Sequence, residues 1–348
     1  MADAPDATPG VSYVMPVLNE VGYLAAAVES VLSQSYDGPV EVILALGPST
    51  DGTAKVVEEL VARDERIRVV ENPGMDIPIG LNLAIAAARH PVVVRVDAHT
   101  ELSDGYTRLG VEVLERTGAA SVGGVMVAEG RPGVQAAVAR AYNSPLGLGG
   151  GAYHRSDARE GPAESAYLGV MRAEVLRSVG GYDETVRRGE DWELNFRIRE
   201  SGHRVWFDPR LRVRYWPRSS WGALVRQFWA TGVWRGELVR RLGTRNSLRY
   251  FAPPVLVVDL LLCLVLAPLM IAGVVSGWPA WLLSLAYLGP LAYLVMLVVA
   301  AVGSHGGLAD RLRFAYALAL MHLSWGSAFL VGATRGARDA VDTSRTES

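Results

Sequence analysis

Long, almost uncharged apolar segments in the C-terminal part of the chain constrain its fold most strongly. Residues 251–276 and 278–302 each exceed the ~20 apolar residues with which a helix crosses a bilayer. A third segment, 312–333, is less uniform because it contains His322 and several glycines. Buried helices of a large soluble protein are the alternative, but two segments of this length disfavour it. We therefore predict a transmembrane region over residues 251–334.

Basic residues near these segments predict their orientation. Four arginines come just before the first segment: Arg240, Arg241, Arg245 and Arg249. Because cytoplasmic loops carry an excess of basic residues, this side and the domain before it are expected in the cytoplasm. The link between the first two segments is uncharged and fits the outside, whereas Arg311 and Arg313 bring the chain back inside. Three spans then place the tail, 335–348, outside, but Arg335 and Arg338 favour the inside, so its sidedness stays open.

The segment 218–250 is basic and aromatic. Residues 211–250 hold nine arginines and one acid, Glu237, together with Trp216, Trp221, Phe228, Trp229 and Trp234. This mixture favours a helix lying in a membrane interface. A basic helix packed on the soluble domain, or one that binds nucleic acid, gives the same pattern. The apolar segments that follow exclude nucleic acid as the partner.

The chain before residue 218 has the pattern of a soluble α/β protein. Residues 1–10 are polar and acidic, without the parts of a signal peptide, so we expect a disordered N-terminus and a cytoplasmic domain over 11–217. Strands alternate with helices there, which favours a mainly parallel sheet covered on both faces. The expected strands are 11–17, 40–46, 67–70 and 92–96, and the expected helices between them are 21–34, 54–63 and 78–89.

The second half of this domain is less regular. The glycine-rich stretch 143–151 and the polar loop 153–165 are typical of a functional lid or of disorder. A strand, two helices and two short closing strands are expected after them: 167–171, 173–179, 189–202, 205–207 and 211–215. The chain contains neither a Gly-x-Gly-x-x-Gly turn nor a Walker loop, which disfavours a dinucleotide-binding dehydrogenase. The single cysteine, Cys263, excludes an intrachain disulfide and a cysteine-cluster metal site.

Two pairs of polar residues stand where chemistry is expected. Asp97 and His99 follow the apolar strand 92–96, and ligands of α/β sheets collect outside the carboxyl ends of strands. An oxygen and a nitrogen ligand can hold one divalent cation, which can hold a diphosphate. An ordinary turn is the alternative, and it is preferred for this stretch taken alone. Glu190 and Asp191 open a helix, where simple capping competes with a catalytic role.

Seven short segments in this order resemble the family-2 glycosyltransferases of the GT-A fold: Met15–Glu20, Pro48–Thr53, Gly80–Asn82, Asp97–His99, Gly169–Arg172, Gly180–Glu184 and Gly189–Trp192. The resemblance covers roughly residues 10–245. The Asp-Ala-His variant followed by a membrane region is similar to the bacterial succinoglycan and exopolysaccharide glucosyltransferases. The resemblance implies an α/β GT-A domain with a mainly parallel sheet, followed by α-helical transmembrane segments.

The resemblance also implies roles for individual residues. Asp97 and His99 occupy the place of the family's Asp-x-Asp signature, which holds Mg²⁺ or Mn²⁺ on the nucleotide diphosphate. The softer histidine ligand favours Mn²⁺ slightly. Alternatively, His99 hydrogen-bonds the phosphate or the acceptor and leaves Asp97 as the only protein ligand. Asp191 takes the place of the catalytic base, supported by Glu190. The remaining donor-pocket residues are Pro16, Asn19, Glu20 and Asn82, together with Asp97.

One departure concerns recognition of the nucleotide base. Family members carry one or two acids just before the Ser-Thr-Asp-Gly turn, where this chain has Leu46 and Gly47. Base recognition must differ here, for instance through backbone groups near residues 45–48, and the choice between UDP and GDP stays open. Asp51 is expected to cap a helix.

The main functional prediction is a membrane-attached, inverting glycosyltransferase. It would move a sugar from a nucleotide-diphosphate donor to a polyprenyl-diphosphate-linked saccharide at the cytoplasmic face of the inner membrane. Membrane lipids and other polysaccharide-assembly proteins are the expected partners. A polyprenyl-phosphate monosaccharide synthase is the first alternative. A non-catalytic scaffold is disfavoured by Asp97 and Asp191, and a transporter by the lack of buried charge in the spans. The sugar, the linkage and the oligomeric state stay open.

Overall fold

The computed structural model describes residues 8–148, 158–243 and 248–337. The chain forms two compact units, Met1–Glu129 with Gly150–Trp216, and Gly130–Gly149 with Pro217–Ser348. The second unit therefore takes in a segment from the range that the sequence assigned to the soluble domain. Parts of the glycine-rich stretch 143–151 and of the polar loop 153–165, expected as a lid or as disorder, lie outside the described residues, namely 149–151 and 153–157.

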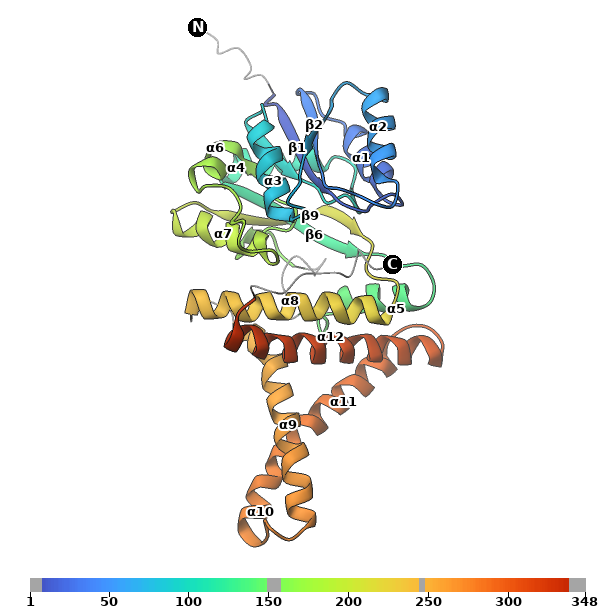
Figure 1. Cartoon of the computed structure of the whole chain (residues 1–348), viewed down its shortest axis with the longest axis vertical. Coiled ribbons are helices and arrows are strands. Elements are labelled where there is room, and N and C mark those ends of the chain that lie inside the picture. Colours follow the sequence, from blue (N-terminus) through green and yellow to red (C-terminus); the bar gives the residue numbers. More distant parts are fainter. Residues whose placement is uncertain (1–7, 149–157, 244–247, 338–348) are drawn as a thin grey trace. The chain divides into compact units, whose positions relative to one another are not determined.

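A nine-stranded sheet forms the centre of the first unit (Figure 1). Its strands run in the order β3-β2-β1-β4-β8-β6-β9-β5, and β7 pairs with β9. The bounds are β1 Val11–Val17, β2 Val40–Leu46, β3 Ile67–Glu71, β4 Val92–Arg95, β5 Thr100–Leu102, β6 Ser121–Ala128, β7 Gly161–Pro162, β8 Val170–Arg172 and β9 Val205–Tyr215. The first four strands are parallel, as predicted. Because β8 is antiparallel to both β4 and β6, the whole sheet is mixed.

Helices cover both faces of this sheet, and their bounds are α1 Leu24–Leu32, α2 Thr53–Arg63, α3 Ile77–Ala87, α4 Tyr106–Thr117, α6 Ala173–Ser178 and α7 Glu190–Glu200. Alternate strand residues point to opposite faces. Val92 and Val94 pack in one buried cluster with α1, α2 and α4, whereas Val93 packs in the other with α3, α6 and α7. The α/β class is confirmed, and the buried Val-rich strands explain it.

The closing strands differ from the prediction, because residues 205–215 form one strand, β9. A register shift between Gly123 and Val125 of β6 accommodates it. Gly124 permits the close approach, since a Cβ there would lie 1.9 Å from the carbonyl oxygen of Leu211. Helix α1 begins at Leu24 rather than near residue 21, after a turn in which the Tyr23 amide bonds to Glu20 O.

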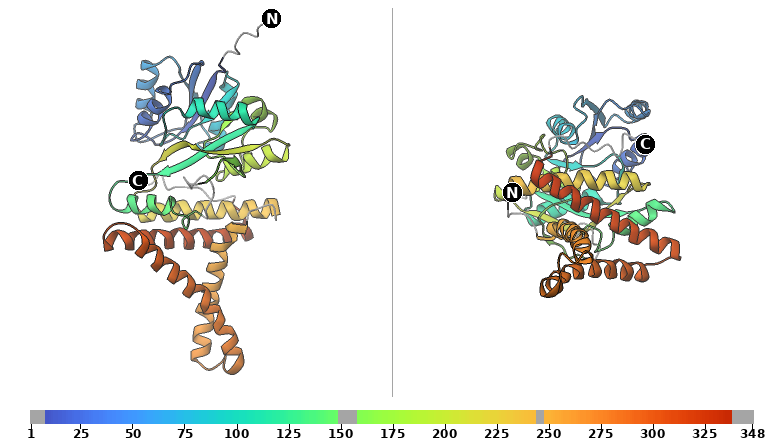
Figure 2. Two further views of the ribbon diagram at one scale, coloured as in Figure 1. Left: turned by 180° about the vertical axis from the view of Figure 1, so that it is seen from behind. Right: turned by 60° about the horizontal axis from the view of Figure 1, so that its bottom comes forward.

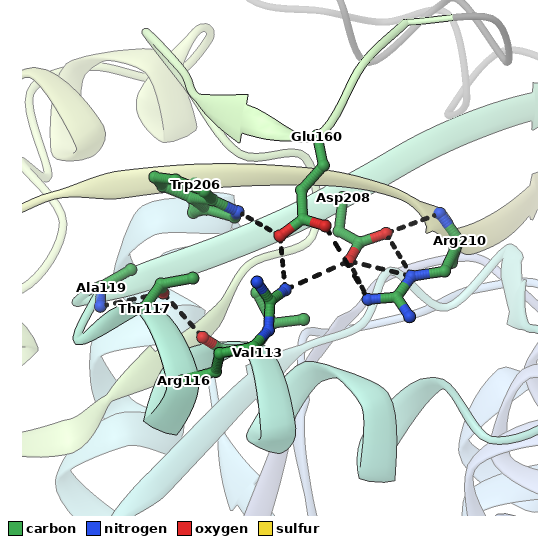
Figure 3. A network of polar contacts seen from close by, with 8 residues as sticks. All are labelled: Val113, Arg116, Thr117, Ala119, Glu160, Trp206, Asp208 and Arg210. Atoms are coloured by element: carbon green, nitrogen blue, oxygen red, sulfur yellow. Dashed lines mark hydrogen bonds and ion pairs between the residues drawn. The ribbon is translucent and has the colours of Figure 1, made fainter.

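A polar network fastens the middle of β9 to neighbouring segments (Figure 3). Asp208 is completely buried and pairs with Arg210 at 2.7 Å. Glu160 accepts hydrogen bonds from Arg116 of α4 and from the indole of Trp206. These contacts compensate the burial of Asp208, and they hold the pKa of its carboxyl below the ordinary value despite burial, which alone would raise it.

The second unit is helical, with the bounds α5 Val134–Tyr142, α8 Trp221–Leu242, α9 Ala252–Ile271, α10 Gly277–Ser284, α11 Leu288–Gly303 and α12 Leu308–Arg335. Among the described residues, three helical stretches are long and apolar enough to cross a membrane: Ala252–Ile271, Gly277–Gly303 and Leu308–Arg335. They agree with the three predicted segments. Asp259 is half-buried within α9, contrary to the expectation that the spans contain no buried charge.

Candidate active site

The loops after β1 and β2 lie side by side at the carboxyl edge of the sheet. Asn19 links them: its amide donates to Ser49 Oγ at 3.1 Å, and its side-chain oxygen accepts from the Thr50 amide at 2.8 Å. Asn19 has a φ of 53°, a left-handed conformation that asparagine tolerates better than most residues. Pro16, partly buried near the end of β1, borders the same edge. The structure therefore brings the first two predicted motifs together.

Asp51 stabilises the start of α2 from the position before the N-cap, which is Gly52 rather than Asp51 as expected. Its carboxylate accepts from the amides of Thr53 at 3.0 Å and Val21 at 3.1 Å. Burial opposes ionisation, but these hydrogen bonds lower the pKa of Asp51 below its ordinary value. Gly47, which lies near Asp51 in the sequence, has no side chain to offer at this edge. Its amide donates a hydrogen bond to Val17 O at 2.8 Å. The acids that family members carry here have no side-chain replacement at Leu46 or Gly47.

Asp97 and His99 emerge from the carboxyl end of β4 beside Glu20. His99 Nδ1 lies 3.1 Å from Glu20 Oε1, and both side chains are largely buried. The ring of Tyr215 packs edge-on against His99 at 5.7 Å. A carboxylate at Nδ1 favours the tautomer that carries its proton there and its lone pair on Nε2. His99 would bind a cation through Nε2, with Glu20 fixing the ring.

Arg95 joins the two predicted pairs of site residues. Its guanidinium is buried, with the side chain only 3% exposed. Nε lies 3.1 Å from Asp97, Nη2 lies 2.9 Å from Glu190, and Nη1 lies 2.5 Å from Asp191. A buried charge is expensive unless it is paired, and three carboxylates satisfy this one. Side chains two residues apart point to the same face of a strand. Arg95 and Asp97 therefore lie on the same face as Val93, which is the face that α7 covers.

Asp191 has the environment of a proton acceptor. It stands in the first turn of α7, after Gly189, whose φ of 74° gives the chain a sharp entry into the helix. Burial raises the pKa of the Asp191 carboxyl to about 7, with Glu190 and Asp97 adding to the increase and Arg95 opposing it. The hydroxyl of Tyr182 donates to Asp191 at 3.2 Å. A base with a pKa near the working pH combines ready deprotonation with useful basicity.

Asn82 lies at this edge but bonds to another loop. Its side-chain amide donates to Tyr182 O at 2.9 Å and to Glu184 at 3.0 Å, and its oxygen accepts from the Tyr182 amide at 2.8 Å. Asn82 thus holds the turn that carries Tyr182, the residue whose ring also faces Arg95. Its direct contacts connect it to the Asp191 side of the site.

The donor set suits a cation that arrives with its nucleotide. Among the described residues, no group of three or more His, Cys, Asp or Glu side chains is arranged to hold a metal ion. Mg²⁺ and similar ions on nucleotides need only one or two protein ligands, because phosphates and water supply the others. Asp97 and His99 are the two residues that the sequence predicts for this role. The hydroxyl of Tyr167 is buried with no hydrogen-bond partner in the described parts of the chain, and it lies within electrostatic range of Asp97.

Arg95 and Tyr167 are the site residues that the sequence reading missed. A lone arginine inside a run of valines was a signal for Arg95, since a buried guanidinium requires acids nearby. Tyr167 falls in the predicted strand 167–171, but it lies in a turn before β8. Leu168 beside it has a φ of 45°, an uncommon conformation for leucine, and such strain clusters at functional sites.

The chain is similar in sequence to known proteins. The sequence model of Glycosyl transferase family 2 matches residues 12–180. The chain is 33% identical over 325 residues to the succinoglycan biosynthesis protein ExoA of Rhizobium meliloti, covering 91% of this chain and 92% of that protein. It is 24% identical to a dolichyl N-acetyl-alpha-D-glucosaminyl phosphate 3-beta-D-2,3-diacetamido-2,3-dideoxy-beta-D-glucuronosyltransferase of Methanococcus voltae, over 66% of this chain and 74% of the other.

One solved structure supports the fold. A mannosyltransferase from Pyrobaculum calidifontis, in complex with GDP-Man and Mn²⁺, superposes with a TM-score of 0.56 at 18% identity. The match covers 97% of this chain and 89% of that one. The GT-A class and the helical region after it are therefore confirmed.

Proposed function

Because the chain belongs to the family-2 glycosyltransferases, we propose that it transfers a sugar, with inversion, from a nucleotide-diphosphate donor to a lipid-linked saccharide. The observation that carries the proposal is the convergence of Asp97, Glu190 and Asp191 on the single guanidinium of Arg95. This convergence supports the proposal, because one buried charge connects the carboxylates proposed for the diphosphate site and for the base.

Asp191 takes the role of the base in this proposal. Its carboxylate would accept the proton of the acceptor hydroxyl as the hydroxyl oxygen attacks the anomeric carbon of the donor. Glu190 pairs with Arg95 at 2.9 Å, and its charge adds to the raised pKa of Asp191. Pro16, Asn19, Glu20 and Asn82 are proposed to border the donor.

Asp97 and His99 are proposed to hold Mn²⁺ or Mg²⁺ on the donor diphosphate. When bound, the cation would neutralise the charge that develops on the leaving nucleotide diphosphate. Glu20 orients His99, and the buried hydroxyl of Tyr167 is proposed to hydrogen-bond the donor.

A lipid-linked acceptor is proposed from two observations. The C-terminal helices are apolar enough to attach the enzyme to a membrane, and the Methanococcus voltae relative is named for transfer to a dolichyl-linked sugar phosphate. The arginines before α9 favour a cytoplasmic face of the inner membrane for the catalytic unit. A bare polyprenyl phosphate is the competing acceptor, and it would need less help from a base.

The experiment supplies membranes that contain the protein with labelled UDP-glucose, UDP-galactose or GDP-mannose, each with Mn²⁺ or Mg²⁺, and examines the lipid extract. We expect label in lipid from one donor, and its loss in Asp97→Ala. Absence of lipid-linked label from every donor would count against the proposal. Unchanged turnover in Asp191→Asn would favour the bare phosphate as acceptor. Asp104→Asn, an exposed acid outside the site, is the matched control.

A further inference from the structure

We infer that α8 and α12 lie together along the membrane surface, and that only α9 and the α10–α11 stretch cross the bilayer. The inference concerns the second unit alone and does not depend on the catalytic roles proposed above. It assigns the α8–α12 pair, defined as Trp221–Leu242 with Leu308–Arg335, to the headgroup region of the leaflet.

The two helices of the α8–α12 pair run side by side in the same direction over several turns (Figures 1 and 2). Trp221 of α8 packs edge-on against Tyr316 of α12, with ring centroids 5.0 Å apart. About four turns further on, Gly236 of α8 meets Phe329 of α12. Because they remain in contact over about 22 Å, α12 cannot cross the bilayer unless α8 crosses with it.

Glycines make this contact close and fix the register. A Cβ on Gly232 or Gly236 of α8 would lie 2.4 Å or 2.2 Å from a carbonyl oxygen of α12. A Cβ on Gly332 of α12 would lie 1.9 Å from Val233 O. No side chain fits at these three positions without moving backbone, so the helices are locked together rather than loosely apposed.

Helix α8 is unsuited to the hydrocarbon layer. It carries four arginines and one glutamate within 22 residues: Arg226, Arg235, Arg240, Arg241 and Glu237. Such charges are strongly disfavoured in the bilayer core but suit an interface, where anionic headgroups attract arginine. Helix α12 has three arginines and one aspartate near its two ends. The partner that this charge fits is an anionic lipid surface.

The apolar character of α12 is explained by protein contacts rather than by lipid. From Ala317 to Ala333 no residue of α12 is exposed, because α5, α8, α9 and α11 pack around it. By contrast, Leu264, Val265 and Ile271 of α9 are more than half exposed, and the most apolar part of Gly277–Gly303 has no buried residue. The surface that needs hydrocarbon is therefore on α9, α10 and α11.

Contacts at its N-terminal end anchor α12 to a polar neighbour. Arg140 of α5 donates to His305 O at 2.8 Å and lies over the ring of Phe314 at 5.9 Å. Further along, His322 bonds to Leu146 O at 2.7 Å. A helix that left the surface to cross the bilayer would leave the Arg140 and His322 groups without these partners. With two crossings rather than three, residue 334 returns to the side on which α8 lies.

Single cysteines test this, because Cys263 is the only native one. In a Cys263→Ala background, three exposed positions are compared: Ser276→Cys between the crossings, Leu308→Cys at the start of α12 and Thr334→Cys at its end. Each is treated with a membrane-impermeant maleimide in vesicles of both orientations. Transfer activity of the Cys263→Ala background, or its extraction as a monodisperse species, verifies folding.

We expect Thr334→Cys to react from the same side as Leu308→Cys, with at least about tenfold preference. Reaction of Thr334→Cys from the side of Ser276→Cys would overturn the inference. If a position reacts only after detergent is added, C-terminal fusions to green fluorescent protein and to alkaline phosphatase determine on which side of the membrane the C-terminus lies. Fluorescence without phosphatase activity supports two crossings, and phosphatase activity contradicts them.

Discussion

Nη1 of Arg95 lies 2.5 Å from Oδ1 of Asp191, although the two residues are 96 positions apart in the sequence. The contact connects the end of β4 to the start of α7. It also connects Asp97, the proposed metal ligand, to the proposed base through one side chain. The geometry thus couples the two halves of the proposed reaction.

Replacing Arg95 is expected to damage both halves. Arg95→Lys keeps one charge but cannot bond to three carboxylates at once, so we expect kcat to fall about 100-fold and the KM for donor to rise. Steady-state kinetics with circular dichroism would measure this. Arg68→Lys is the control, since Arg68 also pairs with a buried acid, Glu41, but outside the site. Equal losses in both variants would show that Arg95 acts only on stability.

The pKa of Asp191, raised to about 7 by burial, predicts a pH dependence. The base acts only when ionised, so kcat/KM for the acceptor should rise with pH and level off above about 7. Below that pH the logarithm of kcat/KM should rise with a slope of about one. Profiles from about pH 5 to about pH 9 would test this. A kcat/KM that does not change with pH below about 7 would contradict the role of Asp191 as the base. The Asp191→Asn variant should have a kcat/KM lower by ~100-fold or more.

Tyr167 and Tyr106 offer a matched pair. The Tyr106 hydroxyl donates to Leu168 O at 3.0 Å, so Tyr106→Phe should cost about 1 kcal/mol of unfolding free energy. Tyr167→Phe removes a buried hydroxyl that has no partner among the described residues, so stability should hold or increase. If the donor uses that hydroxyl, its KM should rise about tenfold. Thermal unfolding and donor kinetics distinguish the two. A Tyr167→Phe variant that is destabilised and keeps its KM would contradict the assignment.

Metal binding should depend on the nucleotide. Two protein ligands are too few for tight binding of a free ion, so we expect Mn²⁺ affinity to rise at least tenfold when UDP or GDP is added. Glu20→Gln should weaken it by about 10- to 100-fold, because Glu20 orients His99. Electron paramagnetic resonance of Mn²⁺ would measure both effects. Tight binding without nucleotide, unaffected by Glu20→Gln, would place the metal elsewhere.

Much of this arrangement was readable from the sequence because it is local. Strands that alternate with helices predicted the parallel pairing of β1, β2 and β4. The position of Asp97 and His99 just after a strand predicted a site at the carboxyl edge, and the family resemblance added Asn19 and Glu20 to it. The apolar segments after residue 250 predicted helices of matching length.

The remainder depends on contacts between distant residues. The antiparallel insertion of β8 has no local signal, and neither does the meeting of Arg95 with Asp191. The continuous strand β9 was missed because it bulges at residues 208–211, where its register shifts against Gly123 and Val125 of β6. Helix α12 is a candidate span by length and composition, but composition does not distinguish lipid contact from burial against α8. In each case the partner, rather than the segment itself, determines the outcome.

The measurement that tests the central claim most directly is transfer of labelled sugar into membrane lipid by three proteins: the unmodified chain, Asp191→Asn and Asp104→Asn. We predict that the unmodified chain and Asp104→Asn label lipid equally, and that Asp191→Asn is slower by about 100-fold or more while still binding donor. Equal rates in all three proteins, or no lipid-linked label from any nucleotide sugar, would contradict the account.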